Sequence, residues 1–166
     1  MAPKPALRLT ATQKVGAVAL LGSLAVLAFI WIYSAQKDLE AQLKQTTDSG
    51  VDYLTLCEFR GNPKLQPCQT IRRNDSQQFA TAIRYLSEAT AASLPKLSPS
   101  SDKILKLGRG NPASSEHVAC YRATTYPGFE QIYISPIETD RECSWPNRYH
   151  AGSVAIPGQA FGQGAI

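Results

Sequence analysis

The feature that most constrains this chain is an apolar run of nineteen residues, Val15–Tyr33, that contains no charged side chain. At a rise of about 1.5 Å per residue, an α-helix of that length covers about 28 Å, which matches the hydrocarbon thickness of a bilayer. Trp31 and Tyr33 end the run, and such aromatic side chains favour the level of the lipid headgroups. The sequence therefore predicts a transmembrane helix over residues 15–33.

Basic residues set the expected orientation of this helix. Lys4, Arg8 and Lys14 precede the run with no acidic residue among them, whereas Lys37 and Lys44 follow it. Because only Lys and Arg count in the positive-inside rule, we expect the N-terminus in the cytoplasm. All four cysteines follow the run, which favours an oxidising compartment for the rest of the chain. We therefore predict a single-pass protein of a bacterial inner membrane with its C-terminal domain in the periplasm.

Two other kinds of segment share this composition. A secretory signal peptide cut after Ala28 would have small residues before its cleavage site, although Phe29–Tyr33 extends the apolar run beyond what a signal peptide needs. The glycine and alanine residues of the run also fit an anchor that can leave the bilayer, but small residues equally serve helix packing in membranes. The membrane helix is the interpretation that we carry forward.

Composition divides the chain into five segments. They are a basic cytoplasmic tail (1–14), the transmembrane helix (15–33), a helical stalk (34–50), an extracytoplasmic domain (51–150) and a flexible Gly/Ala-rich tail (151–166). Of the net charge of +4, the first segment carries +3, while residues 51–166 hold twelve basic and ten acidic side chains. This nearly neutral outer part supports binding to neither nucleic acid nor anionic lipid.

The even set of four cysteines predicts two disulfides in a domain outside the cytoplasm. Three pairings are possible. We favour Cys57–Cys68 and Cys120–Cys143, because each closes a local loop that contains turn residues. Each such cross-link is worth about 3 kcal/mol in the chain-entropy model. The cysteines include no C-x-x-C pair, so the pattern favours neither a metal site nor a catalytic thiol.

Hydrophobic periodicity predicts an α+β domain with an antiparallel sheet and one main helix. We expect that helix over Ser76–Ala92, with Asp75 as N-cap and Gln78 completing a capping box. Strands are expected near 51–59, 66–72, 104–107, 117–125 and 130–136. In the stalk, Leu39 and Leu43 form a narrow i,i+4 pair, which fits a solvated helix or a short contact with another helix.

The sequence shows no catalytic constellation. His117 and His150 are the natural general bases, but no G-x-S-x-G pattern accompanies them. Gly108–Pro112 lacks the phosphate-loop pattern and is predicted to be a turn. We predict no cofactor and no metal.

A binding role has more support, because aromatic and arginine side chains gather in the last third of the chain. Tyr121 and Tyr133 are expected in the core of the sheet, whereas Tyr126, Trp145, Arg148 and Tyr149 fall in expected loops and are the candidate partner-binding residues. We predict a membrane protein that presents a periplasmic protein-binding domain, as an accessory subunit of a membrane assembly or as a tethered inhibitor or immunity protein. The alternative is an envelope hydrolase that acts on cell wall or lipid.

Overall fold

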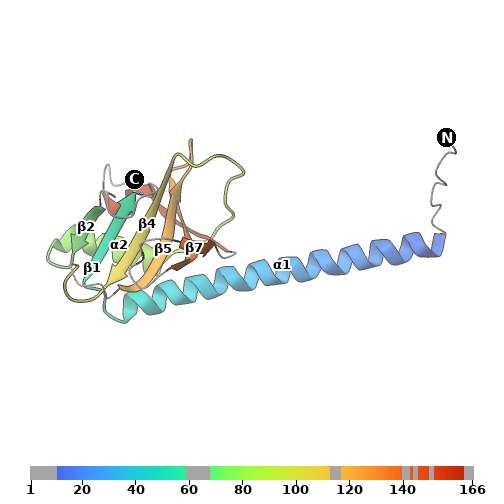
Figure 1. Ribbon diagram of the computed structural model, residues 1–166, viewed down its shortest axis with the longest axis horizontal. Helices are drawn as coiled ribbons and strands as arrows, with labels where there is room; N and C mark the ends of the chain where they lie inside the picture. Colours follow the sequence, from blue (N-terminus) through green and yellow to red (C-terminus); the bar gives the residue numbers. More distant parts are fainter. Residues whose placement is uncertain are drawn as a thin grey trace. The chain divides into compact units, whose positions relative to one another are not determined.

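The computed structural model describes residues 11–58, 68–112, 117–139, 143, 146–149 and 152–162 (Figure 1). The chain divides into two compact units, Met1–Ser34 and Ala35–Ile166. Helix α1 (Ala11–Asp48) begins in the first unit, and its last turns belong to the second. The second unit adds an antiparallel sheet and a further helix, which confirms the predicted α+β class.

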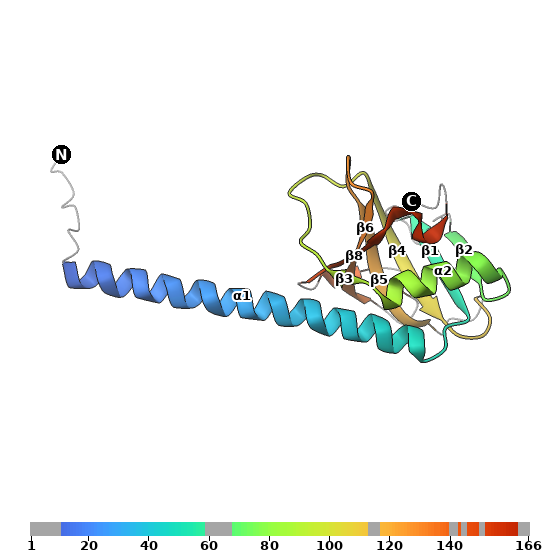
Figure 2. The same ribbon diagram turned by 180° about the vertical axis from the view of Figure 1, so that it is seen from behind.

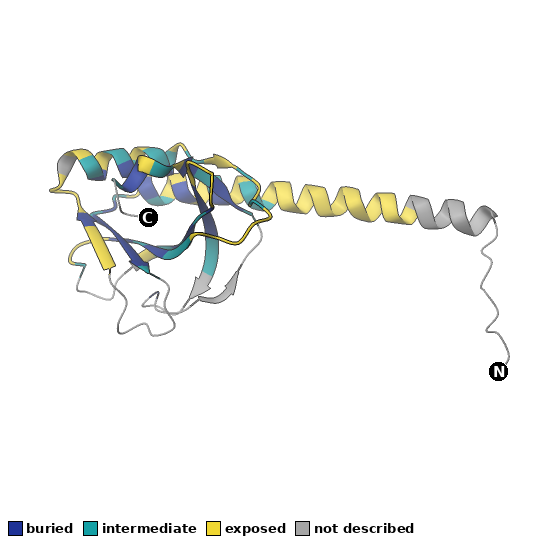
Figure 3. Cartoon of the chain, turned by 90° about the horizontal axis from the view of Figure 1, so that it is seen from above, coloured by how far each residue is buried: buried dark blue, intermediate teal, exposed yellow. Residues whose placement is uncertain are grey.

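The part of α1 that lies in the first unit exposes its apolar side chains. Every residue from Leu20 to Ser34 is exposed, and Figure 3 shows this stretch as one continuous exposed helix. Within the described residues, one helical segment, Leu20–Asp48, is long and apolar enough to cross a membrane. A signal sequence near the N-terminus has the same properties, so what the structure shows is a candidate apolar spanning helix.

The second unit contains an eight-stranded sheet in the order β2-β1-β4-β5-β6-β8-β3, with β7 paired to β6 beside this path. Each of its strand pairs is antiparallel. The strands are β1 (Tyr53–Glu58), β2 (Cys68–Arg72), β3 (Thr90–Ala91), β4 (Ser101–Gly108), β5 (His117–Thr125), β6 (Gln131–Thr139), β7 (Pro146–Tyr149) and β8 (Val154–Pro157). The remaining elements are helix α2 (Ser76–Ser87) and a 3-10 turn, η2 (Gly158–Phe161).

One face of the sheet forms the main hydrophobic core. Alternate residues of the strands point to this face and are buried there, as period-two geometry requires: Leu54, Leu56, Leu105, Leu107, Tyr121, Ala123, Ile132, Ile134, Val154 and Ile156. Helix α2 adds Phe79, Ala82 and Leu86 to the same cluster, and Figure 2 shows α2 lying across the sheet. Strand β1 is buried on its other face too, because Tyr53, Thr55 and Cys57 are also enclosed.

The prediction of a solvated stalk is wrong. Leu39 and Leu43 are 2% and 0% exposed and belong to the same core cluster as the sheet and α2. The alternative, contact with a separate helix, is replaced by contact with the domain of the same chain. Two leucines at i,i+4 spacing are too few to reveal this from sequence, because their partners lie far along the chain.

The prediction of a flexible C-terminal tail is wrong for residues 152–162. Val154 and Ile156 are buried in β8, which pairs with β6 on one side and β3 on the other. The following turn buries Ala160 and Phe161 against α2, and Gln78 Nε2 donates a hydrogen bond of 2.6 Å to Phe161 O. The lack of charge in this segment therefore reflects burial. Residues 163–166 lie outside the described part.

Helix α2 begins as predicted but ends earlier. It stops at Ser87, and Thr90, which falls within the predicted helix, lies in β3. Asp75 is the N-cap residue, but the capping-box prediction is wrong, since its side chain makes no cap hydrogen bond. The Asp75 carboxylate instead accepts a bond of 3.0 Å from the Arg72 backbone N–H at the end of β2. That donor lies on an edge strand, so Asp75 covers part of the sheet edge.

Both favoured disulfide pairings are confirmed. Cys57 and Cys68 are directly opposite residues of β1 and β2, with their Cα atoms 4.1 Å apart. The second disulfide joins Cys120 in β5 to the buried Cys143, with a Cα–Cα distance of 6.0 Å. Because the Cys57–Cys68 bond fastens the edge strand to its neighbour, it supports the register of the first hairpin.

Replacing Leu43 by alanine tests whether α1 is part of the domain core. We expect Leu43→Ala to lower the free energy of unfolding by about 3 kcal/mol, because it removes a fully buried side chain and leaves a cavity. The measurement is urea unfolding of the full chain in mild detergent, followed by near-UV circular dichroism. Gln42→Ala, on the exposed side of the same turn, is the matched control. Equal stability of the two variants would contradict the assignment.

Candidate functional site

The predicted partner-binding residues fall in different environments. Tyr126 is 8% exposed, so most of its side chain is buried and it is not the loop-surface residue that its position suggested. Arg148 and Tyr149 lie in β7, where they pair with Glu138 and Ile137 of β6, but their side chains lie outside the described part of the chain. Trp145 is also outside it. Of the four, the structure therefore places only the Tyr126 side chain.

Tyr121 and Tyr133 lie in the sheet as expected and are each 4% exposed. Burial raises the pKa of the Tyr121 hydroxyl, while a hydrogen bond with Thr46 of α1 acts in the opposite direction. Tyr121 therefore stays protonated at neutral pH and supports the packing of α1 on the sheet.

An aromatic cluster of Tyr126, Phe129 and Tyr133 lies at the turn between β5 and β6. The Tyr126 and Tyr133 rings meet edge to face with centroids 5.4 Å apart, and Phe129 contacts Tyr133 in the same manner at 6.3 Å. The turn itself has Pro127 followed by Gly128 at φ +79°, and Phe129 N donates to Tyr126 O at 3.2 Å. Proline followed by a glycine of positive φ is typical of a type II turn.

This turn leaves Phe129 at the surface. Its side chain is 45% exposed, although its ring contacts Tyr133, which is largely buried. The rigid turn and the buried Tyr133 ring together hold the Phe129 ring in one position. We call Tyr126, Phe129 and Tyr133 the aromatic cluster. Spacing in the sequence does not show which aromatic residue of a short turn faces the core, so the predicted binding residues include Tyr126 and not Phe129.

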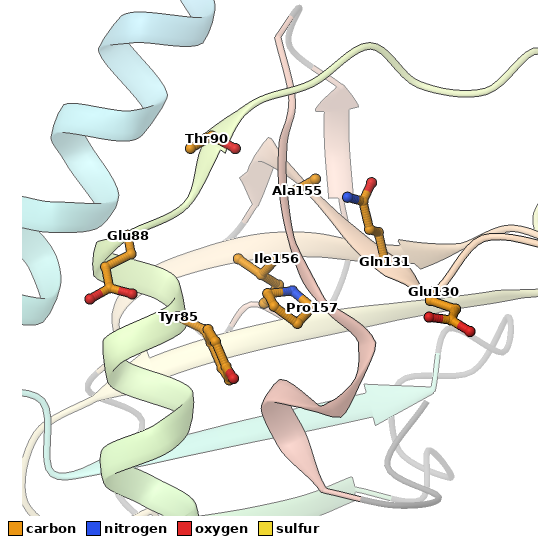
Figure 4. Close-up of a pocket in the computed structure, with 8 residues that line it drawn as sticks. All are labelled: Tyr85, Glu88, Thr90, Glu130, Gln131, Ala155, Ile156 and Pro157. Atoms are coloured by element: carbon orange, nitrogen blue, oxygen red, sulfur yellow. The ribbon is translucent and has the colours of Figure 1, made fainter.

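One surface groove lies between α2 and the β8 side of the sheet and has a volume of 480 Å³ (Figure 4). Figure 4 shows Tyr85 on α2 and Glu88 just after the end of this helix, with Glu130, Gln131 and Pro157 on the opposite side. The residues that line it are Tyr85, Glu88, Thr90, Glu130, Gln131, Ala155, Ile156 and Pro157. Glu88, Glu130 and Gln131 give this lining side-chain hydrogen-bond acceptors.

A second depression, of 410 Å³, lies where β1 begins and β4 ends. Its Asp52 carboxylate accepts a bond of 2.9 Å from Gly110 N and pairs with Arg73 at 3.2 Å. Next to it, Arg109 Nε donates to Gly50 O at 3.0 Å and its Nη2 donates to Ser49 O, just beyond the last residue of α1. A cation suits a helix C-terminus. Gly108–Pro112 is therefore a structural turn, as predicted, and it fastens the end of α1.

A third polar group, the helix–edge junction, consists of Gln36, Glu40, Ala91, Ala92 and Ser153. Glu40 Oε1 accepts a hydrogen bond of 2.5 Å from Ala91 N, and Gln36 Nε2 donates to Ala92 O at 3.1 Å. Ser153 Oγ donates to the same carbonyl at 2.6 Å. Side chains of α1 thus satisfy backbone groups at the β3 edge of the sheet.

Glycine is needed beside this junction. Gly152 has φ +97°, and a Cβ atom there would lie 3.2 Å from the backbone of Ala35. The chain therefore passes the helix backbone at a distance that a side chain would obstruct. Gly152 is the only sign of this close contact in the sequence of this segment. A single glycine in a segment predicted to be a flexible tail does not indicate a contact with a helix.

The pKa of Glu40 is lowered, mainly by its hydrogen bond from Lys37 and also by the Ala91 N–H, while burial opposes the shift. The Lys37 Nζ atom lies 2.7 Å from Glu40 Oε2. Among the described residues, no group of three His, Cys, Asp or Glu side chains is placed to hold a metal ion. The side chains of His117 and His150 lie outside the described part.

No protein-family model, no curated protein and no solved structure matches this chain.

Protonating Glu40 should weaken the helix–edge junction. Because its pKa is lower in the folded protein than in the unfolded chain, its contribution to stability is fully present above the ordinary value of 4.5 and is lost as the pH falls through the folded value. We expect Glu40→Gln to lower the thermal unfolding midpoint at pH 7 and to leave it nearly unchanged at the acid end.

Thermal unfolding of the full chain in detergent, at a series of pH values, measures this difference. Asp38→Asn removes a carboxylate from an exposed position of the same helix and is the control. An equal decrease for both variants, or a Glu40→Gln difference that does not vary with pH, would contradict the assigned role.

Proposed function

We propose that this chain is a single-pass membrane protein that presents an extracytoplasmic domain for binding another protein. It serves as an accessory subunit of a membrane assembly or as a tethered inhibitor or immunity protein. The observation that carries the binding role is the exposed Phe129, whose ring contacts the buried Tyr133, which in turn packs against the buried Tyr126.

The membrane placement is supported by the apolar helix. From Leu20 to Tyr33 the described side chains are exposed to the surroundings, which is costly in water and favourable in lipid. The basic residues before the run favour an N-terminus in the cytoplasm. The two disulfides of the following domain fit an oxidising compartment such as the periplasm.

The aromatic cluster has the properties of an interface hot spot. Interfaces draw most of their binding energy from a few aromatic and arginine side chains that are fully buried by the partner. Phe129 loses little conformational entropy on binding, because its turn and its contact with Tyr133 already restrict it. A partner that covers this ring would bury apolar area that water now reaches.

The length of chain between the apolar run and the domain core bears on the choice between the two versions. Only five residues separate Tyr33, the end of the apolar run, from the core residue Leu39. A tethered inhibitor gains from a long flexible connection, since its domain must reach a separate target. So short a connection is better suited to an accessory subunit. No observation on the described residues favours the envelope-hydrolase alternative.

Phe129→Ala should abolish or strongly weaken capture of the partner. A hot-spot aromatic contributes about 2 kcal/mol or more, which corresponds to a loss of about 30-fold in affinity. The experiment is affinity purification of full-length protein from its native membrane in gentle detergent, with quantitative mass spectrometry of retained proteins. Val118→Ala is the matched control, because Val118 is 42% exposed and lies at the start of β5. If Phe129→Ala retains the same proteins in the same amounts, the aromatic cluster is not the binding site.

The same purification distinguishes the two versions when repeated with a fragment that lacks the apolar segment. This fragment has to begin at Ser34, since a start near Val51 would remove Leu39 and Leu43 from the core. Its folding is checked first by near-UV circular dichroism. We expect a partner that only the full-length chain retains, as for an accessory subunit. A soluble partner that both forms retain would instead assign the inhibitor or immunity role.

A further inference from the structure

We propose that the connection between β3 and β4, residues 92–100, inserts Leu94 and Leu97 into the interfacial layer of the lipid bilayer. This inference rests on the membrane placement proposed above, but not on the protein-binding role. We call residues 92–100 the juxtamembrane loop. The partner it fits is a phospholipid surface, contacted through apolar side chains.

The reach of the chain brings the start of this loop to the membrane. Gln36 follows Tyr33, the end of the apolar run, by three residues, and three residues span at most about 11 Å in any conformation. The Gln36 side chain donates its hydrogen bond to the carbonyl of Ala92, the first residue of the loop. If Tyr33 lies at the headgroup level, Ala92 is therefore within a short distance of the same level.

The loop has the composition of a segment that enters the interface. Leu94 and Leu97 are 43% and 54% exposed, in a domain that buries its other described leucines. Only Val118 and Phe129 are comparably exposed among the described large apolar residues of the second unit. Lys96, between the leucines, is the single charged residue of the loop, and its long stem lets the ammonium stay among the headgroups.

Both ends of the loop are fixed, which lowers the entropic cost of ordering it at a surface. At one end Ala92 N donates to Ser153 O at 2.9 Å, and at the other Ser100 N donates to Thr125 O at 2.9 Å. Between these points the loop bulges away from the sheet (Figure 2). Pro95 and Pro99 restrict the unfolded chain further. The leucines are thus presented outward by a constrained segment.

A lipid surface suits these side chains better than a protein does. The loop lacks the aromatic and arginine side chains that dominate protein interfaces, and its leucines are separated by a lysine. A bilayer interface needs no shape complementarity, and insertion gains free energy in proportion to the apolar area buried. The nearly neutral domain requires no anionic lipid, so phosphatidylcholine is an adequate probe.

Depth-dependent quenching of a fluorescent label tests the proposal. All four native cysteines are in disulfides, so a cysteine introduced into the full-length chain is the free thiol that an NBD label will modify. We would label Leu97→Cys, Tyr33→Cys and Val118→Cys separately. Each is reconstituted in phosphatidylcholine nanodiscs with or without lipid that carries a nitroxide near the headgroup. Val118, 42% exposed at the start of β5, is the control for an apolar surface position elsewhere in the domain.

We expect the nitroxide lipid to quench the labels at positions 33 and 97 at least about twofold more than the label at position 118, because interfacial apolar groups are buried about 5–10 Å into the headgroup/acyl boundary. Quenching at 33 without quenching at 97 overturns the loop proposal and leaves the membrane helix standing. No quenching at 33 overturns the membrane placement and the loop proposal together. A label at position 97 that is shielded from aqueous iodide but is not quenched by the nitroxide lipid indicates contact with a second copy of the protein. That result also overturns the loop proposal.

Discussion

The organisation of this protein depends on the packing of Leu39 and Leu43 of α1 in the hydrophobic core of the domain. These side chains join α1 to the core that one face of the sheet shares with α2. The helix that carries the apolar segment is therefore also a structural element of the domain. Because buried leucines are worth a few kcal/mol each against a total stability of about 5–15 kcal/mol, the domain cannot lose this helix without a large loss of stability.

The two ends of the sheet are protected in the same chemical manner. At the β2 edge, the Asp75 carboxylate accepts a hydrogen bond from Arg72 N, and at the β3 edge the Glu40 carboxylate accepts one from Ala91 N. An unprotected edge strand offers its backbone groups to other chains. Charged acceptors at these positions satisfy the backbone and oppose further strand pairing. The Glu40 contact has a second effect, since it also ties the β3 edge to α1.

The helix–edge junction connects the two proposed surfaces of the domain. It places the start of the juxtamembrane loop beside Gln36, while the other end of that loop bonds to Thr125, next to the turn that carries the aromatic cluster. The apolar residues that we propose to contact lipid and those that we propose to contact a protein thus lie in neighbouring segments. Exposed leucines are tolerated where lipid covers them, and an exposed phenylalanine is tolerated where a partner does.

Local patterns in the sequence determined a good part of this structure. Length and apolarity predicted the candidate spanning helix, alternation predicted the strands, and short loops between cysteines predicted both disulfides. Each of these signals depends on residues near one another in the chain. Only the tertiary structure decided that Leu39 and Leu43 are core residues, that β8 lies within the sheet, and that Phe129 instead of Tyr126 is exposed. These outcomes depend on contacts between segments far apart in sequence, for which a single chain carries no periodic signal.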